Sequence, residues 1–255
     1  MRAVAKALAL LGLVALVAPS QLLVLACSRG AAAMWLPRRF HAGFARVLGL
    51  RVQYLGDAVE GPGVVHACNH LSYLDVQVLG SRLRTRFIAK EDVRRWPVFG
   101  FLARLQQTVF ISRARQRAGD VGAVVAAALA DGHGLCLFPE GTSSDGSRVL
   151  PFKSSVFAPV LDVPRAVVQP VRIELLAVDG RTIGEGGDRD RYAYHGDATL
   201  VPHMWRFLRG RGAQLRVHFL PPIAVSSLPE RKALARAAWS EVAGEAAPPM
   251  EAVEA

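Results

Sequence analysis

The chain has 255 residues and a mass of 27.5 kDa, which is enough for one sizeable α/β domain or a domain with a short appendage. Apolar residues make up 51% and the mean hydropathy is +0.24, which excludes intrinsic disorder and exceeds what a soluble enzyme needs. The formal net charge of +10 favours anionic partners such as phosphate groups, acidic lipids or nucleic acids. Three cysteines cannot supply a disulfide framework, which indicates a reducing compartment.

The N-terminal stretch of residues 7–28 carries no charged side chain and is long enough to cross a membrane as a helix. Pro19, Ser20 and Gln21 interrupt it, so two shapes fit: one kinked span, or two short helices that enter one leaflet and return. Basic residues are more numerous after the stretch than before it, which predicts a main domain on the cytoplasmic face of the inner membrane. A secretory signal, or a lipoprotein processing site at Cys27, is the competing interpretation.

Residues 36–48 form the next expected element. Phe40, Phe44 and Leu48 recur at helical spacing with arginines between them. This pattern suits a helix at a lipid headgroup surface and equally a helix that packs on the domain, and both can hold at once.

The rest of the chain alternates between expected strands and helices. We expect strands at 64–68, 86–89, 108–112, 135–138, 167–176 and 215–219, and helices at 74–79 and 120–130. This alternation predicts an α/β fold with a mixed, largely parallel central sheet flanked by helices. Residues 179–197 are polar and Gly-rich and are expected as a long loop. We therefore predict a membrane-embedded segment at 1–35, an α/β domain at 36–230, and a helix with a frayed tail at 231–255.

The first motif that carries chemistry follows the strand at 64–68. His70 at a strand end can act as a general base near neutral pH, and a carboxylate such as Asp75 would fix its tautomer. The two side chains can meet only if His70 lies in a turn and Asp75 in the first turn of a helix. Ser72 as the N-cap, with Asp75 at N3, supports that geometry. In the alternative interpretation, Asp75 only completes a capping box and His70 is a turn residue.

A metal site is a second interpretation of the same strand. His66, Cys68 and His70 alternate and so share one strand face. Successive ligands on one strand lie ~6.5–7 Å apart, which is too far for all three to reach one ion easily. We therefore predict no metal.

Two further motifs lie at expected strand ends. The run from Pro139 to Ser144 predicts a tight loop at the carboxyl edge of the sheet, where Gly141 lets the backbone approach a ligand and Thr142 can bind an anion. The alternative is a plain turn with Glu140 paired to an arginine. Arg113 follows the strand at 108–112 and suits a phosphate, although a solvated arginine or one that faces acidic lipid fits equally.

Together these motifs resemble the bacterial 1-acylglycerol-3-phosphate acyltransferase family. The resemblance rests on four ordered motifs and covers roughly residues 36 to 222: Asn-His-x4-Asp at 69–75, Phe-Ile-Ser-Arg at 110–113, Phe-Pro-Glu-Gly-Thr at 138–142 and Val-Gln-Pro-Val at 168–171. Ala-Lys at 89–90 and Trp-Pro-Val-Phe-Gly at 96–100 also match that family's pattern.

The resemblance implies transfer of a fatty acyl group from acyl-CoA or acyl-carrier protein to the free hydroxyl of a lysolipid. It implies His70 as the base and Asp75 as its partner. No cofactor is implied, because the thioester donor is already activated. The predicted substrate-binding residues are Asn69, Lys90, Arg113, Glu140, Gly141, Thr142 and Lys153.

Departures from the family pattern concern the acceptor. Ser143 stands where the family often has Arg, and Lys153 lacks the usual Gly two residues later. The runs 142–153, 194–197 and 202–205 look like a subgroup that includes lyso-ornithine lipid acyltransferases. We expect lysophosphatidic acid as the acceptor, with lyso-ornithine lipid as the alternative. His195 and His203 are expected in loop or packing roles, with lining of the acceptor site as the alternative.

Two other classes of protein compete with the enzyme. One is an exported lipid-binding module that uses the basic surface without catalysis. The other is a nucleic-acid binder, which would need interleaved aromatic residues; aromatics are only 7% and the arginines are scattered.

Overall fold

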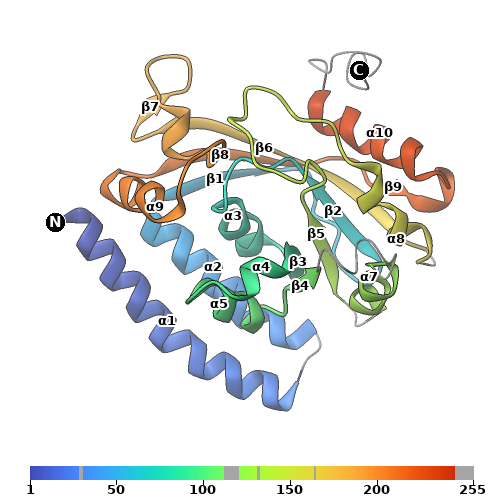
Figure 1. Ribbon diagram of the computed structural model, residues 1–255, viewed down its shortest axis with the longest axis horizontal. Coiled ribbons are helices and arrows are strands. Elements are labelled where there is room, and N and C mark those ends of the chain that lie inside the picture. The colour runs from blue at the N-terminus through green and yellow to red at the C-terminus, as the bar shows by residue number, and fades with distance from the viewer. Residues whose placement is uncertain (29–30, 112–120, 131–132, 164, 245–255) are drawn as a thin grey trace.

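A twisted β-sheet with helices on both faces forms the protein, as the computed structural model shows (Figure 1). The structure describes residues 1–28, 31–111, 121–130, 133–163 and 165–244. Its strands are β1 Leu50–Leu55, β2 Val64–Cys68, β3 Thr85–Lys90, β4 Val109–Ile111, β5 Gly134–Leu137, β6 Val167–Val178, β7 Arg181–Thr182, β8 Ala213–Phe219 and β9 Ile223–Ala224. Its α-helices are α1 Arg2–Cys27, α2 Trp35–Leu48, α3 Asp75–Arg82, α4 Glu91–Arg94, α5 Phe99–Leu105, α7 Val121–Ala130, α8 Ala158–Leu161, α9 Leu200–Arg209 and α10 Arg231–Ala243.

The strand order across the sheet is β1-β8-β6-β2-β5-β3-β4, with β7 and β9 paired to β6. The five strands β6, β2, β5, β3 and β4 run parallel to one another, whereas β8 is antiparallel to β6 and β1 is parallel to β8. The prediction of a mixed, largely parallel sheet flanked by helices is therefore confirmed.

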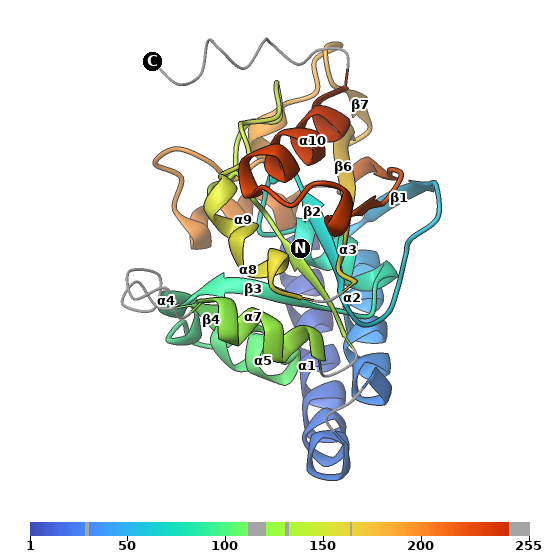
Figure 2. The same ribbon diagram turned by 90° about the vertical axis from the view of Figure 1, so that its right-hand side faces the viewer.

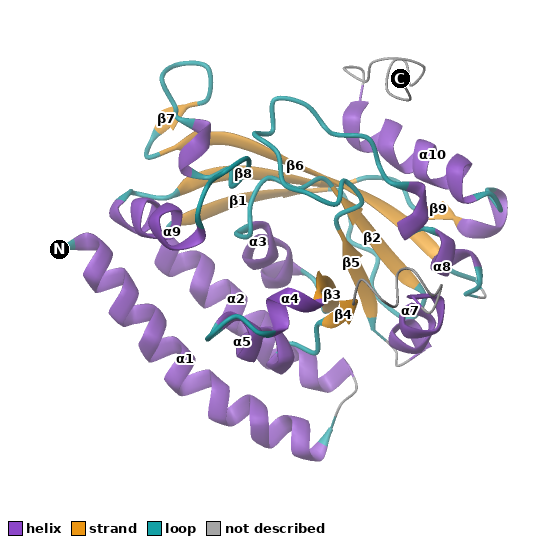
Figure 3. Cartoon of the chain, viewed as in Figure 1, coloured by secondary structure: helices purple, strands orange, loops and turns teal. Residues whose placement is uncertain are grey.

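Two apolar cores lie on the two faces of this sheet. One is covered by α1, α2, α3 and α9, and the other by α7, α8 and α10 (Figures 2 and 3). Strand β2 serves both cores, because Val65 and Ala67 point to the second and Cys68 to the first. Strands buried on both faces need nearly continuous apolar sequence, which is why β2 and β5 are so apolar.

Helix α1 is continuous through Pro19, so the re-entrant pair of short helices is not what the structure contains. Among the described residues, α1 is the helix that is long enough and apolar enough to cross a membrane. It packs beside α2, and the Lys6 ammonium donates to the carbonyls of Leu48 (2.8 Å) and Gly210 (3.1 Å). Near its other end, Gln21 donates to the carbonyls of Ala33 and Leu105. These contacts hold α1 against the α/β body at both ends.

The remaining sequence expectations can be placed on this frame. Phe40, Phe44 and Leu48 of α2 are buried in the first core, as a packed helix requires. The segment 179–197, expected as a loop, also contains the short strand β7 and a 3-10 turn at Arg189–Arg191. The domain boundaries at residues 35 and 230 stay predictions, and the expected tail at 245–255 lies outside the described residues.

Candidate active site

The candidate site lies where the parallel strands β2 and β5 end, at the carboxyl edge of the sheet. Asn69 follows β2 directly, and its side-chain amide donates to the carbonyl of Ile173 (2.9 Å) and accepts from the Ile173 N–H (2.7 Å). Asn69 therefore extends the pairing of β2 with β6 by a side chain. Both ends of its amide are used inside the protein, although sequence analysis assigned it to substrate binding.

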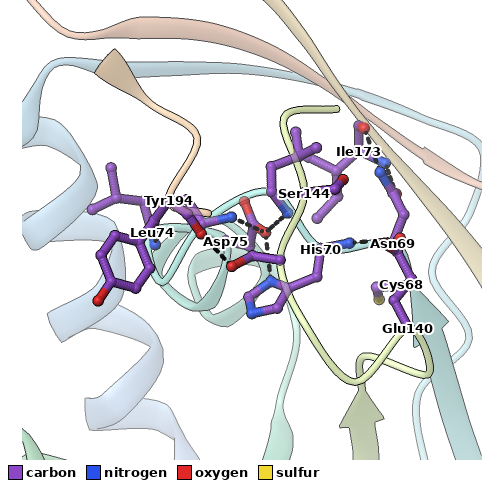
Figure 4. Close-up of polar contacts among 12 residues, drawn as sticks. Cys68, Asn69, His70, Leu74, Asp75, Glu140, Ser144, Ile173 and Tyr194 are labelled. Carbon is purple, nitrogen blue, oxygen red and sulfur yellow. Dashed lines mark hydrogen bonds and ion pairs between the residues drawn. The ribbon is translucent and has the colours of Figure 1, made fainter. Parts of the chain in front are cut away.

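His70 and Asp75 lie next to each other in the turn that follows. His70 Nδ1 is 2.8 Å from Asp75 Oδ2, and Figure 4 shows the two side chains pointing toward one another. Asp75 is the first residue of α3 and its side chain is fully buried, whereas the His70 side chain is 20% exposed. Because a carboxylate only accepts hydrogen bonds, Nδ1 carries the proton and Nε2 is left as an acceptor.

The Asp75 carboxylate accepts four hydrogen bonds from the described residues. Oδ2 also accepts the backbone N–H groups of Leu71 (2.7 Å) and Ser72 (2.9 Å). Oδ1 accepts the hydroxyl of Tyr192 at 2.8 Å. The structure places Leu74 at the N-cap of α3 and Asp75 at its first position, so the expected N-cap at Ser72 with Asp75 at N3 is wrong. Asp75 still accepts the Ser72 N–H and holds His70, so one carboxylate serves both the turn before α3 and the imidazole.

The loop after β5 holds His70 from the other side. The imidazole stacks on the ring of Phe138, with centroids 3.9 Å apart. The backbone N–H of His70 donates to Glu140 Oε1 (3.1 Å), and the backbone carbonyl of His70 accepts from the Ser144 N–H (3.0 Å). The first and second sequence motifs thus form one unit.

Glu140 is almost completely buried, at 2% exposure. Burial raises its pKa to about 8, the His70 N–H opposes this, and the charge of Asp75 adds to it. The expected pairing with an arginine is not found among the described residues. Glu140 thus supports the backbone of His70 rather than presenting a free carboxylate to solvent.

Gly141 and Lys153 come together beside this unit. Gly141 has φ +73°, and a Cβ built on it would lie 2.5 Å from Lys153 Nζ, so the ammonium lies directly over the glycine. The Lys153 N–H also donates to the carbonyl of Pro139 (3.0 Å). Thr142 follows and is exposed. A cation over a bare backbone loop can bind an anionic group.

Of the predicted residues that the structure describes, one is not brought to His70. Lys90 is exposed at the end of β3, which is separated from β2 by β5. Ser112 and Arg113 lie outside the described residues, and with them the expected phosphate contact.

His66, Cys68 and His70 do not come together in the geometry of a metal site. His66 Nε2 lies 3.0 Å from the carbonyl of Val59, and Cys68 Sγ lies 3.6 Å from Cys136 Sγ. Across the part of the chain that the structure describes, no three His, Cys, Asp or Glu side chains gather as a metal site.

Sequence reasoning missed Phe138 as a stacking partner and Tyr192 as a partner of Asp75. It also left the role of His203 open: Nε2 of His203 lies 3.0 Å from the Ala193 carbonyl and Nδ1 lies 3.0 Å from Tyr73 OH, so this buried ring packs and joins elements. His195 pairs with Asp190 at 2.9 Å on the surface. The runs 194–197 and 202–205 differ from the wider family pattern. They are the sequence signal that points to residues 192–205, where Tyr192 and His203 lie.

Known proteins that are similar to this chain are acyltransferases. A family model described as Acyltransferase matches residues 50–174. A lyso-ornithine lipid O-acyltransferase of Brucella abortus is 39% identical over 208 residues, which is 79% of this chain and 78% of the relative. A 1-acyl-sn-glycerol-3-phosphate acyltransferase of Neisseria meningitidis is 32% identical over 179 residues, covering 69% of this chain and 67% of the relative.

The fold has a solved counterpart. The crystal structure of PlsC, the 1-acyl-sn-glycerophosphate (LPA) acyltransferase of Thermotoga maritima, superposes with a TM-score of 0.66, covers 95% of both chains and is 20% identical. Together with the motif order and the identities above, these matches confirm the expected family: the chain belongs to the acyltransferase family that contains the lyso-ornithine lipid and 1-acylglycerol-3-phosphate acyltransferases.

Proposed function

We propose that this protein is a membrane-bound O-acyltransferase that moves a fatty acyl group from acyl-CoA or acyl-carrier protein to the free hydroxyl of lyso-ornithine lipid. The observation that carries the chemistry is the contact between His70 Nδ1 and Asp75 Oδ2, which leaves Nε2 as an acceptor on a side chain that reaches the surface. An alcohol is a poor nucleophile until a base takes its proton, and this arrangement offers that base.

In the proposed reaction, His70 Nε2 takes the proton of the acceptor hydroxyl as its oxygen attacks the thioester carbonyl. The tetrahedral intermediate then collapses, the C–S bond breaks, and the thiolate leaves with the proton returned by the imidazolium. The products are an ester and a free thiol. Asp75 stabilises the imidazolium and keeps its orientation. The base contributes roughly 10²–10⁴-fold, and binding and orientation of the two substrates contribute the rest.

The acceptor assignment rests on the relatives and on position 143. Four relatives named lyso-ornithine lipid O-acyltransferase are 31–39% identical and cover 77–81% of this chain. The Ser143 hydroxyl donates to the carbonyl of Tyr194, so this position ties two loops together and adds no cation to the site. Lys153 over Gly141 is then one cation suited to the single carboxylate of an amino-acid headgroup.

Lysophosphatidic acid is the second candidate acceptor. The same ammonium over Gly141 can bind a phosphate, and the relatives named 1-acyl-sn-glycerol-3-phosphate acyltransferase from two Neisseria species are 31–32% identical.

Membrane binding is part of the proposal. The outer face of α1 exposes leucines, and exposed tryptophans lie on α2, in the turn between α4 and α5, and on α9: Leu8, Leu11, Leu16, Leu22, Leu23, Trp35, Trp96 and Trp205. Isolated exposed leucines are ordinary, but a helix that exposes five of them is typical of a lipid-facing surface. With the basic residues that follow α1, this supports a position on the cytoplasmic face of the inner membrane.

The acceptor is tested with membranes that contain the protein, a radiolabelled acyl donor, and either lyso-ornithine lipid or lysophosphatidic acid. We expect labelled ornithine lipid from the wild type and none from His70→Ala at equal membrane content. Labelled phosphatidic acid alone would overturn the acceptor assignment. Wild-type turnover by His70→Ala would overturn the base assignment.

The membrane surface is tested by changing Leu to Gln at positions 8, 11, 16 and 23. We expect the variant to be released into the soluble fraction, and unchanged sedimentation with membranes would contradict the proposed surface.

A further inference from the structure

The segment 188–197 crosses the two loops that form the candidate site and is bonded to both. On the first loop, the Tyr192 hydroxyl donates to Asp75 Oδ1 (2.8 Å) and the Tyr194 N–H donates to the carbonyl of Leu71 (2.8 Å). On the second loop, Ser143 donates to the Tyr194 carbonyl and Arg189 donates to the carbonyl of Gly146 (3.1 Å). The segment thus completes the site from a distance in sequence, since Tyr192 lies 117 positions from Asp75 and Arg189 lies 43 positions from Gly146.

The segment is itself held in place. The N–H groups of Tyr192 and Ala193 donate to the Arg189 carbonyl, which closes the 3-10 turn. The Ala193 carbonyl lies 3.0 Å from His203 on α9. The Tyr192 ring is completely buried and lies edge-on to Phe207 of α9, with centroids 6.1 Å apart. Tyr192 consequently has a fixed position, and its hydroxyl is directed at Asp75.

We propose that Tyr192 is a positioning residue for acyl transfer, which acts through Asp75 on His70. The inference rests on the proposed role of His70 as the base. Asp75 Oδ2 is shared by His70 and two backbone N–H groups, whereas Tyr192 is the partner recorded for Oδ1 among the described residues. The hydroxyl therefore stops the carboxylate from turning about its Cβ–Cγ bond and takes up part of its negative charge. Loss of the hydroxyl leaves more of that charge to the imidazolium.

The titratable groups around Asp75 and Tyr192 come from several elements. Glu140 approaches from the loop after β5 and Cys68 from the end of β2. Tyr54 on β1 and Tyr73 in the turn before α3 also act electrostatically on Tyr192. Burial raises the pKa of Tyr192 well above its usual range, and the charge of Asp75 adds to this. The Tyr192 hydroxyl thus keeps its proton and stays a donor at any pH used to assay the enzyme.

The experiment compares Tyr192→Phe with Tyr54→Phe in the full-length, membrane-bound protein. Tyr54 is a matched control, because its hydroxyl bonds to the Val78 carbonyl and to Ser81 on α3, the same helix that carries Asp75, and has no contact with Asp75 or His70. For Tyr192→Phe we expect kcat to fall about 10-fold with KM changed less than about 2-fold. We also expect the acidic limb of the pH profile of kcat/KM to move to higher pH. Tyr54→Phe lowers Tm and leaves that limb in place.

A second variant should shift the acidic limb of the pH profile in the opposite direction. 3,5-Difluorotyrosine at position 192 keeps the shape of the side chain and makes its hydroxyl a stronger donor, so the acidic limb should move to lower pH. The inference is overturned if Tyr192→Phe keeps the acidic limb of the wild type, whether or not its kcat falls. A purely structural role of Tyr192 could lower kcat but would not move that limb. The outcome stays separate from the proposed function: full activity in His70→Ala refutes the base, whereas an inactive His70→Ala beside an unshifted Tyr192→Phe refutes only the role of Tyr192.

Discussion

The imidazole of His70 lies flat against the ring of Phe138, with centroids 3.9 Å apart and planes inclined by 17°. Phe138 is the first residue after β5, so a side chain from one strand end supports the ring of the next. Asp75 holds the edge of the imidazole and Phe138 holds its face. Such two-sided support restricts both rotations of the histidine side chain.

Replacing Phe138 by leucine should therefore loosen His70. We expect kcat to fall about 10-fold with little change in KM, because Nε2 then spends less time in the reactive orientation. Phe219→Leu is the control, since it removes a buried ring on β8 and leaves His70 untouched. Both variants should lose about 1 kcal/mol of stability. Equal activity of the two in a thioester turnover assay would show that the stacking has no catalytic effect.

Asp75→Asn tests the carboxylate that accepts four hydrogen bonds. The amide NH₂ of asparagine would face a donor, so we expect kcat to fall by roughly 10²–10⁴-fold and the free energy of unfolding by about 1–3 kcal/mol. Glu174→Gln is a suitable control, because the Glu174 carboxylate pairs with Arg172 and Arg216 on the sheet and not with His70. A thermal melt and a turnover assay on each variant separate the two effects, and an active Asp75→Asn would reduce Asp75 to a helix cap.

Glu140 makes stability depend on pH in a defined direction. Its pKa rises from 4.5 to about 8 on folding, so the folded state binds the proton more tightly and stability falls as pH increases between these values. Glu140→Gln can still accept the His70 N–H but has no charge to bury. The variant should gain about 2 kcal/mol over the wild type between pH 5 and pH 8, or roughly 4–8 °C in Tm. A Tm difference that is the same at both pH values would contradict the assignment.

Gly141→Ala tests the anion-binding loop. The new methyl group would lie 2.5 Å from Lys153 Nζ and would require φ +73°, so it displaces the ammonium and strains the turn. We expect KM for the acceptor to rise about 10-fold with a smaller change in KM for the acyl donor. Gly184→Ala is the matched control, because it has φ +94° with open space around it. If both variants raise KM equally, the contact with Lys153 plays no part in acceptor binding.

Sequence reasoning succeeded where the signal was local. The strand at 64–68 has the observed bounds, since a run that is apolar except for His66 and is bounded by Gly63 and Asn69 leaves little choice. The condition set for His70 and Asp75, a turn residue and the first turn of a helix, is the geometry that the structure has. Hydrophobic periodicity and capping rules act over a few residues, and both features are of that size.

The failures concern contacts between distant segments. Tyr192 reaches Asp75 across 117 positions, and no pattern within residues 179–197 indicates that partner. The stacking of His70 on Phe138 follows from the pairing of β2 with β5, which the order of strands along the chain does not determine. The sequence left open whether Pro19 lies in one span or separates two short helices; α1 is one helix, and the contacts of Gln21 with Ala33 and Leu105 hold it against the body.

The distribution of the three thiols has a practical consequence. Cys68 and Cys136 are sealed between strands with their sulfur atoms 3.6 Å apart, whereas Cys27 is exposed at the last residue of α1. A maleimide dye added to the native protein would therefore attach at one defined point. Quenching of that dye by lipids brominated at known depths would measure how far the end of α1 enters the bilayer, without any engineered cysteine.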